Sequence, residues 1–285
     1  MGDFADALLR LLLMDGVVHS PRATLTPLPG GVSSEIYCVD DGGETFVVKR
    51  ALGKLKVQDD WIADISRNRY EQRYLAYVAR LLPQSVPALR AVKPASGYFA
   101  MEYLGSGYRN WKDLLLSADF NSAHAGAAAR VLGTIHRFSS GDPEAAALFD
   151  SGSCFYQLRL EPYLLTTGRR YPQLLTLFEA EVARLTSTSE CLVHGDFSPK
   201  NILIGGNRLV ILDCEAAWYG DPAFDVCFLL NHLFLKSLFH LRAEGPAEMI
   251  RTFWQEYTLA SGRALNERIL VLAGQRAWTH RADLQ

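Results

Sequence analysis

The stretch that decides how this chain folds is Leu192–Val226, which reads LVHGDFSPKNILIGGNRLVILDCEAAWYGDPAFDV. Within it, two apolar runs of strand-forming residues, 202–204 and 209–212, flank Gly205-Gly206-Asn207. Glycine and asparagine favour the tight turns that join antiparallel strands. The pattern therefore predicts a β-hairpin.

Four polar residues stand at the two ends of this hairpin. Asp196 and Asn201 precede the first strand, and Asp213 and Glu215 follow the second. Because a hairpin returns the chain to its starting point, we expect these side chains to converge at its open end. Such oxygen ligands suit Mg²⁺, which prefers one or two carboxylates together with substrate phosphates. Asp196, Asn201 or Asp213 could each instead simply cap a turn.

The composition of the chain limits the number of domains and the kinds of partner that we expect. The chain has 285 residues, 49% of them hydrophobic, which suits one two-lobed unit or two domains. A net charge of −2 gives no field that would recruit nucleic acid or a membrane. Five scattered cysteines indicate reduced thiols, and the apolar run 8–14 is too short for a membrane span. We expect a cytoplasmic monomer or homodimer.

A turn of small residues, Gly30-Gly31-Val32-Ser33-Ser34, precedes a second predicted hairpin over residues 36–48. Backbone N–H groups in such a turn can approach phosphates closely, although most Gly-Gly turns are ordinary turns. Lys49 ends this hairpin, where a lysine is commonly an edge residue with a packed stem. Together with the polar residues downstream, the pattern favours Lys49 as a phosphate-binding cation.

A helix is predicted from about residue 65 to residue 82, before Pro83. Glu71 lies close to the apolar face of this helix, where a carboxylate needs a partner if it is buried. It could instead be exposed and paired with Arg67 or Arg73. Residues 140–172 contain several glycines and prolines and are expected to be less regular.

The residues HGDFSPKN at 194–201 have the order H-x-D-x-x-x-x-N of kinase-like catalytic loops. With Asp213-x-Glu215 and the sequence GDPAFD at 220–225, this stretch resembles the aminoglycoside phosphotransferase and choline kinase superfamily. The resemblance covers residues 28–226. It implies an α+β, bilobal protein-kinase-like fold, in which residues 1–104 form a small nucleotide-binding lobe with an antiparallel sheet and a helix. Residues 105–285 would form a mainly helical lobe.

The resemblance also implies ATP and Mg²⁺ as cofactors and gives individual residues their roles. Asp196 would be the catalytic base or orienting carboxylate, and Glu71 would pair with Lys49. The expected metal ligands are Asn201, Asp213 and Glu215, and the expected nucleotide contacts are Gly30, Gly31, Ser33, Ser34, Lys49, Glu71, Met101, Glu102 and Leu104. His194 and Asp225 would support the catalytic loop, and His136 is expected to be a core histidine.

The resulting hypothesis is an ATP-dependent phosphotransferase that acts on a hydroxyl of a small molecule, such as an aminoglycoside, a thiosugar or an amino alcohol. One alternative is a catalytically silent kinase-fold regulator, which the intact polar residues disfavour. Another is a protein kinase, which the missing G-x-G-x-x-G and Ala-Pro-Glu motifs disfavour. Arg159, Arg169 and Arg170 mildly disfavour a polycationic acceptor, although surface charge is the simpler interpretation of each.

Overall fold

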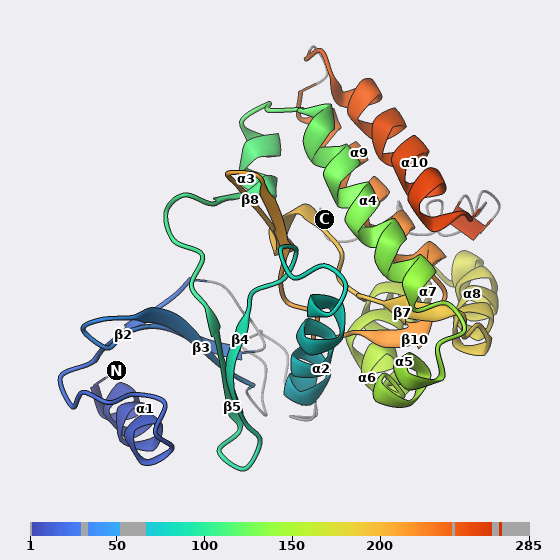
Figure 1. Cartoon of the computed structure of the whole chain (residues 1–285). Coiled ribbons are helices and arrows are strands. Elements are labelled where there is room, and N and C mark those ends of the chain that lie inside the picture. Colours follow the sequence, from blue (N-terminus) through green and yellow to red (C-terminus); the bar gives the residue numbers. More distant parts are fainter. Residues whose placement is uncertain (1, 30–33, 52–66, 241–242, 264–267, 270–285) are drawn as a thin grey trace.

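The computed structural model describes residues 2–29, 34–51, 67–240, 243–263 and 268–269 (Figure 1). Its first part contains α1 (Gly2–Met14), β1 (Thr24–Pro27), β2 (Ser34–Asp40), β3 (Thr45–Ala51), α2 (Arg67–Ala79), β4 (Leu89–Lys93), β5 (Tyr98–Glu102) and β6 (Arg109–Asn110). The middle contains α3 (Trp111–Leu116), α4 (Ser122–Phe138), α5 (Pro143–Leu148), α6 (Gly152–Phe155), the π-helix η1 (Tyr156–Leu165), α7 (Thr166–Arg170), η2 (Pro172–Leu174) and α8 (Leu175–Ser187). The last part contains β7 (Cys191–Val193), η3 (Pro199–Asn201), β8 (Ile202–Gly205), β9 (Arg208–Ile211), β10 (Trp218–Gly220), α9 (Ala223–Leu238) and α10 (Pro246–Ser261).

The N-terminal part is built on an antiparallel sheet of five strands in the order β1-β2-β3-β5-β4. Successive side chains of a strand point to opposite faces, so each strand contributes side chains to both faces of the sheet. In β3, Phe46 and Val48 join the apolar cluster that α1 forms with the sheet, whereas Val47 packs with α2 in the main core. Lys49 lies two residues after Val47, so its side chain points to the same face of the sheet, the one that packs against α2.

The remainder of the chain is mainly helical, and α10 packs along α4 and also contacts α9 (Figure 1). The Ala-rich face of α4 buries Ala125, Ala128 and Ala129. A Cβ atom at Gly133 would lie 2.7 Å from the Cβ of Ala260, so α4 and α10 cross closely at this glycine. Small residues on this face therefore allow the close approach of the two helices.

The hairpin predicted from the sequence is present as β8 and β9. Ile202 pairs with Ile211 and Gly205 with Arg208, which leaves Gly206-Asn207 as the two-residue turn. Gly206 has φ +55°, the left-handed conformation that such a turn requires. The backbone N–H of Leu212 also donates to the carbonyl of Asn201 at 2.9 Å, so the two ends of the hairpin meet as expected.

Residues 140–172 were expected to be less regular, and this expectation is wrong, because most of the segment is helical. Pro143, Gly152 and Pro172 begin helices, whereas Pro162 lies inside the π-helix η1 and Gly168 inside α7. Pro143 occupies the first turn of α5, which the Asp142 side chain caps, and Gly152 begins α6. Buried Phe155 and Leu160 then hold the short helices against the core, so tertiary packing outweighs weak local preference.

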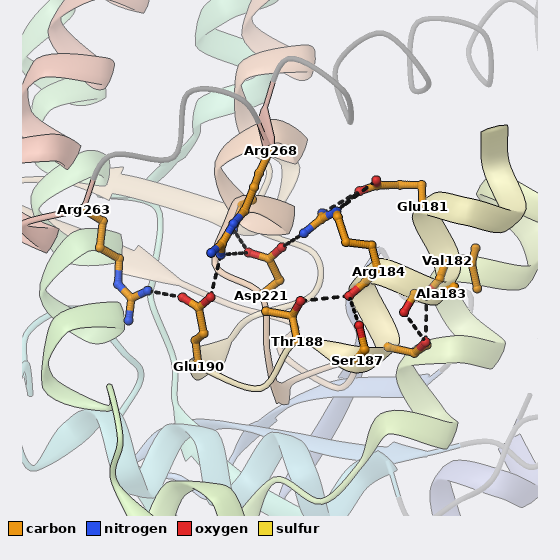
Figure 2. A network of polar contacts seen from close by, with 12 residues as sticks. Glu181, Val182, Ala183, Arg184, Ser187, Thr188, Glu190, Asp221, Arg263 and Arg268 are labelled. Atoms are coloured by element: carbon orange, nitrogen blue, oxygen red, sulfur yellow. Dashed lines mark hydrogen bonds and ion pairs between the residues drawn. The ribbon is translucent and has the colours of Figure 1, made fainter.

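A network of six charged residues fastens the segment after α10 to α8 and to the residues beside β7 and β10 (Figure 2). We call it the Asp221 network; its members are Glu181, Arg184, Glu190, Asp221, Arg263 and Arg268. Asp221 is fully buried and pairs with both Arg184 and Arg268.

Among the described helices, none is both long and apolar enough to cross a membrane.

Candidate active site

A cavity of about 400 Å³ lies between the five-stranded sheet, α2 and the β8–β9 hairpin. Its polar lining comes from distant parts of the chain: Lys49 from β3, Glu71 from α2, Lys200 and Asn201 from η3, and Asp213 after β9. Leu28, Ile36, Val47, Leu75, Met101, Leu104, Leu203 and Leu212 are among its apolar lining residues. An apolar cavity with a few convergent polar groups is the usual form of a small-molecule site.

Lys49 is the centre of charge in this cavity. Its Nζ lies 2.6 Å from Oδ1 of Asp213 and 2.7 Å from Oε1 of Glu71, so the predicted pair with Glu71 is present. Burial acts to lower the pKa of Lys49, but the carboxylates of Asp213 and Glu71 outweigh it and hold the pKa above its usual value. Lys49 is therefore a fixed positive charge.

The two carboxylates that share Lys49 differ in their electrostatics. Burial would raise the pKa of Asp213, but Lys49 overrides this and holds that pKa well below its usual range. Burial raises the pKa of Glu71 to about 7, against the opposing effect of Lys49. Asp213 also has φ +61°, an uncommon conformation for a residue with a side chain. Asp213 is thus the firmly ionised partner in the cavity.

Asp196 is buried beside this cavity and is held by two cations. Its Oδ2 lies 3.1 Å from Nη2 of Arg159 and 3.0 Å from Nζ of Lys200. The side-chain amide of Asn201 donates to the backbone carbonyl of Asp196 at 3.0 Å. Because Lys200 and Asn201 both line the cavity, they connect Asp196 to it directly.

Buried side chains behind the loop fix its backbone. Asp225 accepts the N–H groups of His194 and Gly195 at 2.7 and 2.9 Å, which is the tethering role expected for it. His194 Nδ1 accepts the N–H of Asp196 at 3.1 Å. Gly195 has φ +78°, and a Cβ there would lie 2.3 Å from the carbonyl oxygen of Ala216, so this position requires glycine.

His136 supports the same loop from the core. It is fully buried, and its two ring nitrogens lie 2.9 Å from the Tyr257 hydroxyl and 3.3 Å from Oδ2 of Asp225. The expectation of a core histidine with satisfied hydrogen bonds is confirmed.

The remaining predicted nucleotide residues fall into three groups. Met101, Glu102 and Leu104 line the cavity, and the carboxylate of Glu102 forms a two-point ion pair with Arg208 at 2.7 and 3.1 Å. Ser34 is buried at the start of β2 and is not part of the lining. The predictions for Gly30, Gly31 and Ser33 concern residues outside the described part of the chain.

Of the three predicted metal ligands, Asn201 and Asp213 line the cavity, whereas Glu215 does not. Oε2 of Glu215 lies 3.4 Å from Nε of Arg67. No group of three or more His, Cys, Asp or Glu side chains among the described residues is placed to hold a metal ion by itself. One carboxylate and one amide oxygen still fit Mg²⁺, because this ion completes its shell with phosphates and water.

Sequence reasoning missed Lys200 and named Arg159 only as a candidate substrate contact. Surface charge was the preferred interpretation of Arg159, and it is wrong: the residue is 9% exposed, and its Nε donates to the Gly195 carbonyl at 2.5 Å. Arg169 and Arg170 are exposed, and Arg169 pairs with Glu161. A signal for Lys200 existed, because it stands inside the catalytic-loop motif, but the sequence around Arg159 offers none.

Comparison with known proteins agrees with this geometry. A family model described as the phosphotransferase enzyme family matches residues 24–267. The methylthioribose kinase of Pectobacterium atrosepticum is 25% identical over an alignment covering 85% of this chain and 70% of that protein. The methylthioribose kinase of Erwinia tasmaniensis is 24% identical, with 77% of this chain and 62% of that protein covered.

Solved structures share the fold. A choline/ethanolamine kinase family protein from Mesorhizobium loti superposes with a TM-score of 0.62 at 16% identity, covering 98% of this chain and 83% of that one. A choline kinase from Cryptosporidium parvum gives a TM-score of 0.63 at 12% identity, covering 96% and 87%. These neighbours confirm the predicted α+β, kinase-like fold class, while the boundary at residue 104 stays a prediction. With the family model matching most of its length, this chain belongs to the phosphotransferase enzyme family.

Proposed function

We propose that this protein transfers the γ-phosphate of ATP, bound together with Mg²⁺, to a hydroxyl group of a small molecule. The observation that carries the proposal is the convergence of Lys49, Asn201 and Asp213 on one cavity that Lys200 connects to Asp196. Phosphoryl transfer requires positioned reactants and neutralised charge more than covalent help from the protein. This arrangement supplies a cation, metal-binding oxygens and an orienting carboxylate within one site.

The nucleotide would occupy the cavity. Met101, Leu75 and Leu203 would contact the adenine ring, and the backbone beside Leu104 would bind its edge. The backbone N–H of Glu102 already donates to Ala88, which leaves the residues after β5 for this task. Lys49 would bind the phosphates, while Asn201 and Asp213 would hold Mg²⁺. Bound there, Mg²⁺ would neutralise negative charge on the phosphate oxygens.

Asp196 would accept a hydrogen bond from the acceptor hydroxyl and aim its oxygen at the γ-phosphate. Both of its cationic partners contact Oδ2, so the other oxygen, Oδ1, is the one placed to meet the hydroxyl. The contacts of Arg159 and of Asn201 with this loop would keep the carboxylate in one orientation. Such orientation is a large part of catalysis when two reactants must be aligned.

Among acceptors, the site favours neutral or anionic molecules over polycations. An aminoglycoside would need unpaired carboxylates, whereas Asp196 already has two cationic partners and Glu161 is paired with Arg169. Both curated relatives are named methylthioribose kinases, so a thiosugar belongs among the first candidates. A hydroxy amino acid is another.

The test is acceptor-dependent ADP formation with a panel of methylthioribose, homoserine, choline and aminoglycosides. Asp196→Asn should abolish turnover of whichever acceptor is used, while Mg²⁺-ATP still raises the melting temperature of the variant. Asp150→Asn, which changes an exposed aspartate in the same way, is the matched control and should keep full activity. Full turnover by Asp196→Asn would show that Asp196 does not orient the acceptor hydroxyl.

A further inference from the structure

Three lysines gather where α3, η3 and α9 pack against one another, and each element contributes one of them. They are Lys112 in the first turn of α3, Lys200 in η3 and Lys236 in the last turn of α9. These positions are far apart in the sequence, so the fold alone creates the cluster. We call it the lysine cluster.

The lysine cluster has little compensating negative charge. Within the described part of the chain, no carboxylate forms an ion pair with Lys112 or Lys236, and the polar neighbour of Lys236 is Nδ1 of His232 at 3.4 Å. Burial, followed by the charges of Lys112 and Lys200, lowers the pKa of Lys236 to about 8. Lys236 is half-buried, whereas Lys112 and Lys200 are exposed. Holding like charges beside a half-buried amine is costly, and perturbed groups of this kind concentrate at functional sites.

The lysine cluster adjoins the reacting group. Lys200 belongs to it and also contacts Oδ2 of Asp196, which Arg159 contacts as well. The other acids near this loop, Asp213 and Glu215, lie against Lys49 and Arg67. Among the described residues, Asp196 is the only carboxylate ion-paired with a member of the lysine cluster, so the place where α3, η3 and α9 meet carries an excess of positive charge.

We propose that the acceptor carries an anionic group, a carboxylate or a phosphate, and that this group binds the lysine cluster while the acceptor hydroxyl meets Asp196. The proposal rests on the proposed function and narrows its substrate class. The triphosphate of the nucleotide is not the expected occupant, because Lys112 and Lys236 do not line the nucleotide cavity. A cationic acceptor would be repelled, and a neutral thiosugar would leave the charge unmatched.

The first experiment measures the rate at which each lysine of the full chain is acetylated, by mass spectrometry, with saturating Mg²⁺-AMP-PNP in the nucleotide cavity. Inorganic phosphate and acetate serve as probes, each compared with sodium chloride at equal ionic strength. An anion bound to Lys236 would keep its amine protonated and unreactive. We expect about tenfold slower acetylation at a probe concentration about ten times its Kd. Lys93, which donates to the carbonyl of Asp15, is the internal control and should not change.

The second experiment uses variants. Lys112→Gln should abolish the protection of Lys236, and Lys236→Gln should raise the KM of an anionic acceptor at least tenfold, whereas Lys93→Gln should do neither. Protection by phosphate alone or by acetate alone would support the proposal and identify the anionic group. The proposal is wrong if neither anion protects Lys236 while Mg²⁺-AMP-PNP still raises the melting temperature, a result that leaves the proposed function standing. Turnover of methylthioribose with a KM unchanged by Lys236→Gln would overturn it equally.

Discussion

Two charged regions of this molecule differ in how completely their charges are matched. In the Asp221 network, Asp221 has Arg184 and Arg268, Glu190 has Arg263 and Arg268, and Glu181 has Arg184 (Figure 2). In the candidate site, Lys49, Arg159 and Lys200 pair with Glu71, Asp213 and Asp196, but the other two members of the lysine cluster form no ion pair among the described residues. Matched charges leave no place for a ligand, whereas the uneven distribution in the site leaves several.

This difference teaches that the two regions should respond differently to substitution. Breaking a buried, completed network should lower stability, because it leaves charges that the fold had paired. Changing the site should lower activity more than stability, because functional groups are commonly placed where they strain the fold. The predictions below test this separation.

The largest effect is expected for Lys49→Met. Removing one positioned electrostatic group typically costs about 2.7–4 kcal/mol of transition-state stabilisation, a loss of about 10²–10³ in rate. Glu71 can take up a proton, and Asp213 borders the cavity, so we expect a smaller fall in melting temperature than for a network variant. The measurements are steady-state kinetics and thermal unfolding. The prediction is wrong if Lys49→Met lowers the melting temperature strongly while the folded part of the sample keeps the native kcat and KM.

Asp221→Asn should act in the opposite way. Its carboxylate is fully buried, but Arg184 and Arg268 are partly exposed and can regain water. We therefore expect a loss of about 2–3 kcal/mol in the free energy of unfolding, below the full value for a buried pair. Urea unfolding measures it, with Glu248→Gln in an exposed pair with Arg251 as the control, expected to cost less than about 1 kcal/mol. Equal losses in both variants would contradict this interpretation.

Glu71 makes the stability contribution of the site depend on pH. Burial raises the pKa of Glu71 to about 7 in the folded protein, above its usual value of 4.5. A raised folded pKa adds stability below pH 4.5, and this contribution is lost as the pH rises to about 7. The unfolding free energy of the native chain, measured relative to that of Glu71→Gln, should fall over this window by roughly 2.5 kcal/mol, because each pKa unit corresponds to about 1.4 kcal/mol. A difference independent of pH would contradict it.

Arg159→Lys should have the smallest effect. Lysine cannot reproduce the arginine fork that contacts both the Gly195 carbonyl and the Asp196 carboxylate. We expect kcat to fall about tenfold, roughly 1.4 kcal/mol, with the KM for ATP unchanged, because Arg159 positions Asp196 and does not line the nucleotide cavity. Arg169→Lys, at an exposed position of the same region, should leave kcat as it is. A changed KM for ATP with normal kcat would exclude the positioning role.

Much of the fold could be predicted from the sequence where local patterns decide it. The β8–β9 hairpin follows from two apolar runs on either side of Gly205-Gly206-Asn207. The Lys49–Glu71 contact was implied by the family resemblance, and a carboxylate close to an apolar helix face is consistent with it. For the hairpin, a short stretch of sequence carries the physical cause.

Other features depend on packing between distant segments and could not be predicted in this way. The burial of Arg159 requires the π-helix to meet the loop before Asp196, and Lys236 meets Lys112 because α9 packs on α3. Glu215 shows the limit of a motif, because its side chain lies against Arg67 although two residues earlier Asp213 borders the cavity. Only the three-dimensional fold decides which way such a residue points.

The π-helix that carries Arg159 also bears on how such a protein could change by descent. Its hydrogen bonds span five residues, whereas those of an α-helix span four. Loss of a single codon between Tyr156 and Arg159 could restore ordinary α-helical winding and swing the guanidinium around the axis, away from the Gly195 carbonyl. One short deletion could thus remove an arginine from Asp196 in a single step. Such a change would make the site around Asp196 less positive.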